Sequence, residues 1–303
     1  MISLRQLRYF EALSRHRHFG RAAQACAVTQ PALSMQIREM EQAYGVSLVE
    51  RGRHGVHLTP LGEDAAARAR TVLSALGDME QALRGHGRLL EGPLRLGVIA
   101  SVAPYLLPHL LPRLQQAYPG VEVSLRESLT EHLVEALVNG ELDVAIMSLP
   151  LEHSDLDSAE LFDDPFFLAL PPDAVGAPSE PVSPEAVCAT DLLLLEDGHC
   201  LRDQALQLCH KVDARQLRRF GASSLSTLAE LVANGQGVTL LPGLFVDAER
   251  GLAARLRLLR FREPQPRRTL GLFWRKTLPF PEDIKVLADL IRSCQRREAP
   301  EVL

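Results

Sequence analysis

Two cysteines, each beside a histidine, form the segment best able to do chemistry in this sequence. The stretch EDGHCLRDQALQLCHK, residues 196–211, carries His199 before Cys200 and His210 after Cys209. Thiolates are nucleophiles and metal ligands, whereas thiols buried in a core behave as small apolar groups. The segment therefore allows three interpretations: buried hydrophobic side chains, metal ligands or a redox pair.

A zinc site is the weakest of these interpretations. The two histidines and two cysteines are suitable ligand types, but side chains adjacent in sequence rarely converge on one tetrahedral ion. The sequence also contains no C-x-x-C spacing. We therefore expect no metal and no cofactor.

A redox pair raises a geometric conflict, because the segment after Cys200 has the pattern of a helix over residues 201–211. A helix rises about 1.5 Å per residue, so a nine-residue separation puts Cys200 and Cys209 about 13 Å apart along its axis. A disulfide needs Cα atoms roughly 4.4–6.8 Å apart. A bond between these cysteines would therefore require the helix to unwind or rearrange.

The composition is typical of a globular protein, and the sequence shows no apolar run long enough for a membrane segment. The chain has 303 residues, 46% hydrophobic and 23% charged, which favours two or three domains with real cores. Its first residues, MISLRQLRYF, have no apolar signal region, and apolar runs such as 192–195 are too short to cross a bilayer. We expect a cytoplasmic protein in which a disulfide would be transient and functional. The other cysteines, Cys26, Cys188 and Cys294, show no pattern, although Cys26 is expected in a core.

The net charge of −5 is unevenly distributed. Residues 1–60 hold eight arginines, no lysine and four glutamates, a net charge of +4, whereas the remainder carries −9. A small basic segment followed by a larger acidic one predicts an N-terminal nucleic-acid contact with a second function behind it.

The basic segment has the element pattern of a helix-turn-helix with a wing. Leu4, Leu7, Phe10 and Leu13 recur at helical spacing, 19–26 reads as a second helix, and 30–41 as a third with a proline in its first turn. Residues 48–59 read as a hairpin with a basic tip, and the alternative is a small bundle with a solvated basic face. The expected DNA contacts are Thr29, Gln30, Pro31, Ser34, Arg38, Arg51 and Arg53.

A long helix follows, beginning at Thr59-Pro60, where threonine caps and proline opens the first turn. Its apolar residues step by four and three, which is the spacing of a two-helix interface, although packing on the protein's own body is the alternative. The expected dimerisation residues are Val72, Leu76, Met79 and Leu83, after Ala65 and Ala69 in the same series. Glycines at 85, 87 and 92 end the helix as a hinge.

Beyond residue 93, strands and helices alternate, which predicts an α/β fold with parallel sheets, and the length favours two lobes with a cleft. The predicted strands are 94–99, 121–126, 142–147, 166–170, 192–195, 218–222, 238–241, 256–260 and 270–274, and the predicted helices are 104–117, 130–139, 201–211, 225–234 and 281–296. The predicted domains are 1–59, 60–87 and 88–303. Ligands in such folds sit at the carboxyl ends of strands. We therefore expect Ser101, Thr130, His199 and Cys200 to approach one another.

The N-terminal stretch RQLRYFEAL…HFGRAAQACAVTQPALSMQIREMEQAYGVSLVER…VHLTPLGE resembles the LysR-type transcriptional regulators. The resemblance extends over the chain, because the later α/β pattern suits that family's effector domain. It implies a winged helix-turn-helix, a linker helix and a two-lobed, periplasmic-binding-protein-like domain. It also implies a regulator of transcription that is not an enzyme, with double-stranded DNA and RNA polymerase as partners.

Within that family, the stretches LLLLEDGHCLRDQALQLC, GPLRLGVIASVAPYLLPHLLP, GVTLLPG and PRRTLGL resemble the peroxide-sensing members. This resemblance implies that peroxide oxidises Cys200, that Cys209 resolves it as a reversible disulfide, and that a cellular dithiol resets the pair. It implies a homotetramer on DNA that controls antioxidant genes. The implied peroxide pocket consists of Ser101, Thr130, His199, Arg202, Asp203 and Arg268.

Two positions depart from the pattern of those relatives. Ser101 stands where the best-known members have threonine, so the hydroxyl is retained. Glu131 follows Thr130 where relatives often have histidine, and the histidine here is His132. These differences alter the electrostatics expected of the pocket.

The residues themselves are consistent with peroxide chemistry. Cys200 lies at the start of the predicted helix, where free backbone N–H groups favour a thiolate. Two alternatives remain: a LysR-type regulator that binds a small metabolite in the cleft, with incidental cysteines, and a thiol peroxidase. The helix-turn-helix and the lack of a P-x-x-x-[ST]-x-x-C signature oppose the peroxidase.

Overall fold

The structure, a computed structural model, describes residues 1–52, 55–83, 89–184, 192–208 and 217–295. The chain forms two compact units, Met1–Gly87 with Val138–Glu141, and Arg88–Leu137 with Leu142–Leu303. In the part of the chain described, no helix is long and apolar enough to cross a membrane.

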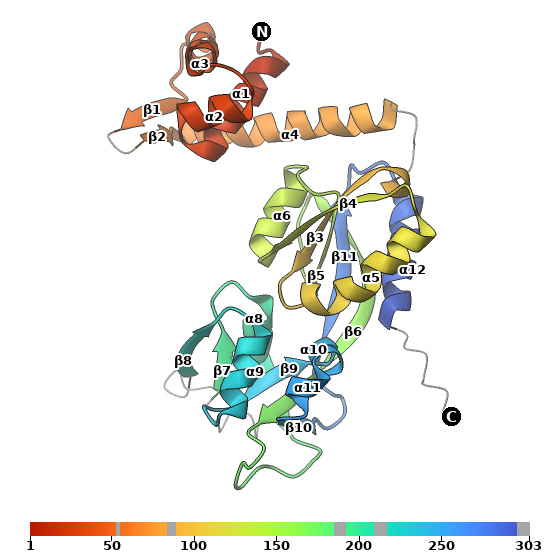
Figure 1. The fold of residues 1–303 in the computed structure, drawn as a ribbon. Helices are drawn as coiled ribbons and strands as arrows, with labels where there is room; N and C mark the ends of the chain where they lie inside the picture. Colours follow the sequence, from red (N-terminus) through yellow and green to blue (C-terminus); the bar gives the residue numbers. More distant parts are fainter. Residues whose placement is uncertain (53–54, 84–88, 185–191, 209–216, 296–303) are drawn as a thin grey trace. The chain divides into compact units, whose positions relative to one another are not determined.

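The N-terminal unit is a helix-turn-helix with a two-stranded wing, as predicted (Figure 1). Its elements are α1 (Leu4–His16), α2 (Phe19–Ala25), α3 (Gln30–Tyr44), β1 (Val49–Gly52), β2 (Gly55–Leu58) and α4 (Pro60–Leu83). A capping box between Ser3 and Gln6 starts α1, and Thr29 caps α3. Phe10, Leu13 and Leu33 are fully buried between the helices. Apolar spacing therefore produced the expected three-helix core.

Helix α4 has two distinct stretches. Near its start Ala66 and Ala69 are buried, and α4 packs against α1. Further along, Val72 is 46% and Met79 53% exposed. The predicted apolar series is thus shared between the unit's own core and an open surface.

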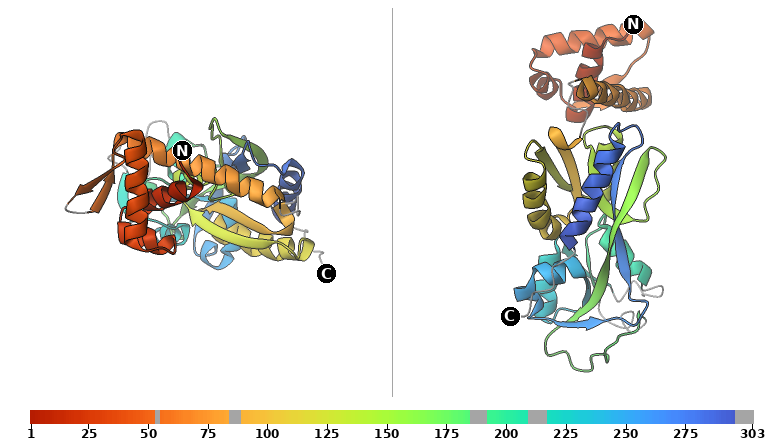
Figure 2. Two further views of the ribbon diagram at one scale, coloured as in Figure 1. Left: turned by 90° about the horizontal axis from the view of Figure 1, so that it is seen from above. Right: turned by 90° about the vertical axis from the view of Figure 1, so that its right-hand side faces the viewer.

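The second unit is an α/β structure with two lobes. Its elements in chain order are η1 (Leu89–Glu91), β3 (Pro93–Ile99), α5 (Ala103–Ala117), β4 (Glu122–Ser128), α6 (Thr130–Val138), β5 (Val144–Leu149), β6 (Leu156–Leu170), β7 (Leu192–Leu195), α8 (Cys200–Leu208), β8 (Leu217–Ala222), α9 (Leu225–Ala233), β9 (Thr239–Pro242), α10 (Gly243–Ala248), α11 (Arg250–Ala253), β10 (Arg257–Arg260), β11 (Arg267–Arg275) and α12 (Pro281–Gln295). Helix α12 packs against α5 and β6 (Figure 2). The short elements η1, α10 and α11 were not predicted.

The prediction of parallel sheets was wrong in part. The main sheet has the order β10-β6-β11-β5-β3-β4, with β9 also on β6, and only β3 pairs in parallel, with β4 and β5. Strand β11 runs antiparallel to β5 and β6, and β6 is antiparallel to β9 and β10. Strand β7 pairs in parallel with β8 in a separate sheet. Apolar runs identify buried strands but do not encode their direction.

Strand β6 joins the two lobes and is much longer than the predicted strand 166–170. Its first part, from Leu156 to Pro165, pairs with β11, whereas its last residues pair with β9 and β10. The first lobe therefore contains β3, β4, β5, α5, α6 and α12, and the second contains β7–β10 and α8–α11. The missed part of β6 is rich in acidic and polar residues, so only its backbone pairing makes it a strand.

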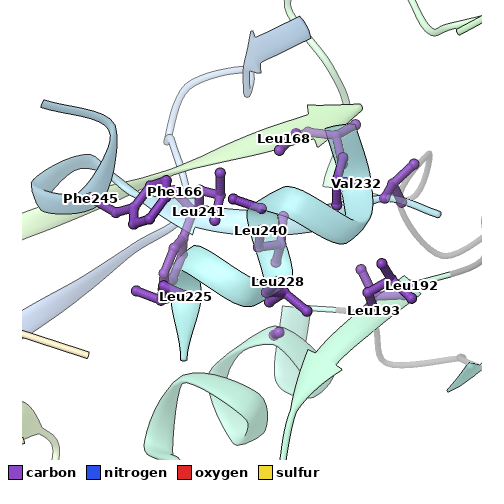
Figure 3. Packing of buried hydrophobic residues seen from close by; sticks show 14 of the residues in the cluster. Phe166, Leu168, Leu192, Leu193, Leu225, Leu228, Val232, Leu240, Leu241 and Phe245 are labelled. Atoms are coloured by element: carbon purple, nitrogen blue, oxygen red, sulfur yellow. The ribbon is translucent and has the colours of Figure 1, made fainter. Parts of the chain in front are cut away.

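A cluster of leucines and phenylalanines forms the core of the second lobe (Figure 3). All four residues of β7 are buried, and they belong to the same cluster as Leu225 and Leu228 of α9. Tyr105 of α5 also enters the cluster, edge-on to Phe245 with ring centroids 5.5 Å apart. This core holds β7, and thus the loop that leads to Cys200, in a fixed place.

Candidate functional site

A pocket of about 810 Å³ opens between the two lobes of the second unit. The first lobe contributes Thr130 at the start of α6 and residues 148–151 at the end of β5. The second lobe contributes Cys200 and further residues of α8. Strands β6 and β11 contribute Phe166 and Arg268. The pocket therefore lies at the carboxyl ends of strands, as predicted for a ligand site.

Cys200 is the first residue of α8 and lines this pocket. Its half-buried thiol donates to the Ser148 hydroxyl, with Sγ and Oγ 3.6 Å apart. The first N–H groups of a helix have no intrahelical acceptor, so they are available to a polar group at this end of α8. The contact crosses from one lobe to the other. Ser148 was not predicted, because a serine in a buried strand has no sequence signature.

Gly198 shapes the loop that places Cys200. Its φ of 92° lies in the region that favours glycine, and a Cβ there would be 3.0 Å from Leu129 Cδ1. Leu129 immediately precedes Thr130, so the loop of the second lobe packs against the first lobe beside the pocket. A larger residue at 198 would move the two apart.

Two polar atoms in the pocket are buried without a hydrogen-bond partner among the described residues. They are the Thr130 Oγ1 and the Gln204 Oε1, and both residues line the pocket. Buried polar atoms are nearly always hydrogen-bonded, so each of these oxygens can bind a polar group that enters the pocket. Thr130 was predicted. Gln204 was missed, because glutamine on a helix usually faces solvent.

Arg268 lines the pocket from β11 and is only 2% exposed. Its Nε donates to Asp164 Oδ2 at 2.9 Å, and its Nη1 donates to the Ser101 hydroxyl at 2.8 Å. Ser101 is thereby buried against Arg268 and is not among the described residues that line the pocket. The structure brings Ser101 and Arg268 together as predicted, but with Ser101 behind the arginine.

Three further residues were predicted for the pocket, Arg202, His199 and Asp203, and only one of them lines it. Arg202 pairs with Asp197, Nε to Oδ1 at 2.9 Å, and donates to the Leu195 carbonyl, so its charge is engaged at the end of β7. His199 is half-buried, and burial lowers its pKa below the ordinary 6.5 while the Glu196 carboxylate opposes the shift. Neither lines the pocket, whereas exposed Asp203 does. The geometry therefore favours Arg268 over Arg202 as the cation of the pocket.

The predicted resolving residue cannot be placed in the same way. Cys209 and His210 lie outside the described residues, as does Cys188. Among the residues described, no group of three histidine, cysteine or carboxylate side chains gathers as a metal site. The zinc interpretation therefore stays untested at its central residues.

The predicted DNA contacts lie on and beside α3. Gln30, Pro31 and Arg38 are exposed, Ser34 is half-buried, and the Thr29 hydroxyl accepts from the Ala32 N–H. Arg53 lies outside the described residues, and Arg51 is described only as backbone of β1. The exposed face of α3 is thus available for a groove of DNA.

Of the predicted dimerisation residues, Leu76 is half-buried and Leu83 is the last residue of α4.

Comparisons with known proteins match both units. Residues 4–63 match the family described as bacterial regulatory helix-turn-helix protein, lysR family, and residues 87–295 match the LysR substrate binding domain. The chain is 41% identical to the DNA-binding transcriptional dual regulator OxyR of Escherichia coli K12, over 96% of this chain and 95% of that protein.

Solved structures similar to this chain are also structures of OxyR. A cysteine-to-aspartate variant of full-length OxyR from Pseudomonas aeruginosa has a TM-score of 0.79 and 36% identity, covering 97% of this chain and 96% of that one. A cysteine-to-serine variant of Corynebacterium glutamicum OxyR with hydrogen peroxide bound has a TM-score of 0.64 and 34% identity, covering 96% and 94%. Domain matches, identity and fold all agree, and the chain therefore belongs to the LysR family of transcriptional regulators and, within it, to the OxyR group.

Proposed function

We propose that this protein is a transcriptional regulator that binds DNA and senses hydrogen peroxide through oxidation of Cys200. The observation that carries the proposal is the pocket itself, where the Cys200 thiol at a helix start shares a cavity with two unpaired polar atoms, on Thr130 and Gln204. The relatives named as OxyR, one of them with hydrogen peroxide bound, support the same ligand.

The first chemical step is attack of the Cys200 thiolate on one oxygen of hydrogen peroxide. The S–O bond forms as the O–O bond breaks, and the leaving hydroxide takes a proton to become water, so that Cys200 becomes a sulfenic acid. The Thr130 hydroxyl can donate to the peroxide, and Gln204 Oε1 can accept its hydrogen. Arg268 supplies the charged donor for the departing oxygen.

The second step joins Cys200 to Cys209. The Cys209 thiolate attacks the Cys200 sulfur, an S–S bond forms, and the hydroxyl of the sulfenic acid leaves as water. Over both steps two thiols and one peroxide give one disulfide and two waters. A cellular dithiol restores the thiols by exchange. Each protein molecule is oxidised once per signal and then reset, so it is not an enzyme in the sense of turnover.

Disulfide formation must change the structure, because α8 is helical from Cys200 to Leu208. Eight residues of helix span about 12 Å. A single further Cα step of about 3.8 Å cannot bring the next residue within the roughly 4.4–6.8 Å that a disulfide needs. Oxidation therefore unwinds α8 and breaks the Cys200–Ser148 contact between the lobes. A covalent bond thus biases a two-state element.

On the DNA side, we propose that α3 enters the major groove with Gln30 and Arg38 as base contacts. Exposed Val72 and Met79 pair α4 with a second copy, and two dimers form a tetramer. Remodelling of the sensing domain changes how this assembly sits on its operator. The altered assembly then changes how RNA polymerase transcribes antioxidant genes.

The test is one equivalent of hydrogen peroxide added to the purified, reduced protein, followed by intact mass and peptide mapping. The expected product has lost two hydrogens and yields a linked Cys200–Cys209 peptide. Cys209→Ser should stop at the sulfenic acid, and Cys200→Ser should not respond. An unchanged wild-type protein would refute peroxide sensing and leave a regulator that binds a metabolite in the cleft. Sustained peroxide decomposition with a recycling dithiol would instead indicate a peroxidase.

A further inference from the structure

Two aspartate–arginine pairs lie side by side where β6 and β11 cross between the lobes. Asp163 pairs with Arg267, Oδ2 to Nε at 3.1 Å, and both are open to solvent. The next residue on each strand, Asp164 and Arg268, forms a second pair whose side chains are 1% and 0% exposed. Successive strand residues face opposite sides of a sheet, so one pair is outside and the other is inside. Both arginines, Arg267 of the exposed pair and Arg268 of the buried pair, border the pocket.

The Asp164 carboxylate is held by groups from two directions. Its Oδ2 accepts from Arg268 Nε, and the Arg268 Nη2 also lies 2.9 Å from it. Its Oδ1 accepts from the backbone N–H of Leu244 in α10 at 2.9 Å. A Cβ at Gly243 would be 3.2 Å from the same oxygen, so the start of α10 sits tightly on the carboxylate. Asp164 is thus fixed by the second lobe while it fixes Arg268.

The hydrogen bonds and the ion pair of Arg268 account for four of its five guanidinium N–H groups. Nε donates to Asp164 Oδ2, and Nη2 donates to the Ser101 carbonyl at 3.1 Å and lies 2.9 Å from Asp164 Oδ2. One hydrogen of Nη1 goes to the Ser101 hydroxyl. A guanidinium has five N–H donors, so one N–H of Nη1 has no acceptor among the described residues. Arg268 borders the pocket with its side chain covered, so in the proposed reaction this N–H becomes a donor to peroxide once the ligand enters.

We infer that Asp164 is a positioning residue for the peroxide reaction. This inference rests on the proposed function. Asp164 and Ser101 between them use four of the five donors of Arg268 and so direct the fifth. Asp164 also neutralises the guanidinium, so Arg268 assists the departing oxygen through an oriented N–H rather than as a free cation. Orientation of this kind is worth orders of magnitude in rate.

The inference makes a prediction that a purely structural role does not share. Asp164→Asn leaves one side-chain oxygen for two donors, Arg268 Nε and the Leu244 N–H, and it removes the negative charge that neutralises Arg268 beside the pocket. The peroxide reaction, which needs orientation, should become about tenfold slower or worse. Alkylation of Cys200 by iodoacetamide, which needs only the thiolate, should stay equal or become faster at a fixed, mildly acidic pH, because a free cation favours the thiolate. General loosening of the site would move both rates in the same direction.

The experiment measures both rates by mass spectrometry in full-length Cys209→Ser protein, with and without Asp164→Asn. Glu230→Gln is the matched control, because it removes one negative charge from an exposed ion pair with Arg255, neither member of which lines the pocket, and both of its rates should stay within about twofold of the parent. An Asp164→Asn variant with an unchanged peroxide rate, or with both rates reduced together, would overturn the inference. A parent that does not react with peroxide would overturn the proposed function itself.

A second comparison covers the case in which Asp164→Asn does not fold, since it leaves a charge buried without its partner. Arg268→Gln and the double variant Asp164→Asn with Arg268→Gln both lack the buried cation. If Asp164 acts only through Arg268, the two react with peroxide at the same rate. A double variant more than about threefold slower than Arg268→Gln would show an independent role and overturn the inference.

Discussion

The conflict between helix α8 and the disulfide makes a quantitative prediction at Gln207. This residue lies on the exposed side of α8 and also borders the pocket. Alanine and glycine at an exposed helix position differ by up to about 1 kcal/mol in favour of alanine. If the oxidised form has lost this helix, the difference acts only on the reduced form. Gln207→Gly should therefore destabilise the dithiol relative to the disulfide, compared with Gln207→Ala.

The size of the effect follows from the two-electron couple, for which 30 mV corresponds to about 1.4 kcal/mol. The Gln207→Gly variant should have a midpoint potential up to about 20 mV more negative than the Gln207→Ala variant. The assay is equilibration of both proteins in dithiol redox buffers, with the disulfide fraction read by mass spectrometry. Circular dichroism should show loss of helix on oxidation. Equal potentials, or a shift in the opposite direction, would refute the unwinding of α8.

Four further predictions concern other parts of the molecule. Arg38→Ala should weaken operator binding by about 1–3 kcal/mol in a fluorescence titration without changing thiol reactivity, because the exposed arginine reads bases or phosphates only. Burial holds the pKa of His199 below 6.5, so the unfolded chain binds a proton before the folded protein does, and the free energy of unfolding falls as the pH drops below 6.5. In urea unfolding, His199→Gln should lose less of this free energy on acidification than the parent, and an identical pH profile would contradict the prediction. Gly198→Ala should slow oxidation of Cys200, because φ of 92° and Leu129 both disfavour a side chain there; an unchanged rate in the peroxide assay would mean that the loop is not tightly held. Leu76→Asp with Met79→Asp should yield monomers by light scattering, and a persistent dimer would show that α4 is not the interface.

The sequence predicted the N-terminal unit well because its local signals are strong. Thr29 and Thr59 with Pro60 mark helix starts, and Phe10, Leu13 and Leu33 have helical spacing, so α1, α3 and α4 were found where they occur. These features depend on neighbours in the chain, which a single sequence displays directly.

The second unit was less predictable because its organisation depends on distant partners. The direction of β11 and the polar first part of β6 are set by pairing between residues about a hundred positions apart. Cys200 and Thr130 were identified from residue type and family resemblance. Asp164 was missed because aspartate is seldom fully buried, and only the three-dimensional partner Arg268 explains it.

The path of the chain through the lobes also has a consequence during synthesis on the ribosome. The second lobe, with Cys200, is complete once β10 has emerged, whereas the first lobe still lacks β11, the strand that lies between β5 and β6. Arg268 is on that strand and follows Cys200 by about 70 residues, which takes several seconds at about 5–20 residues per second. A nascent chain therefore carries the thiol before it carries the pocket. On the proposed function, a chain that has not yet added β11 lacks Arg268 beside Cys200, so we expect its peroxide reaction to be slower than that of the finished protein.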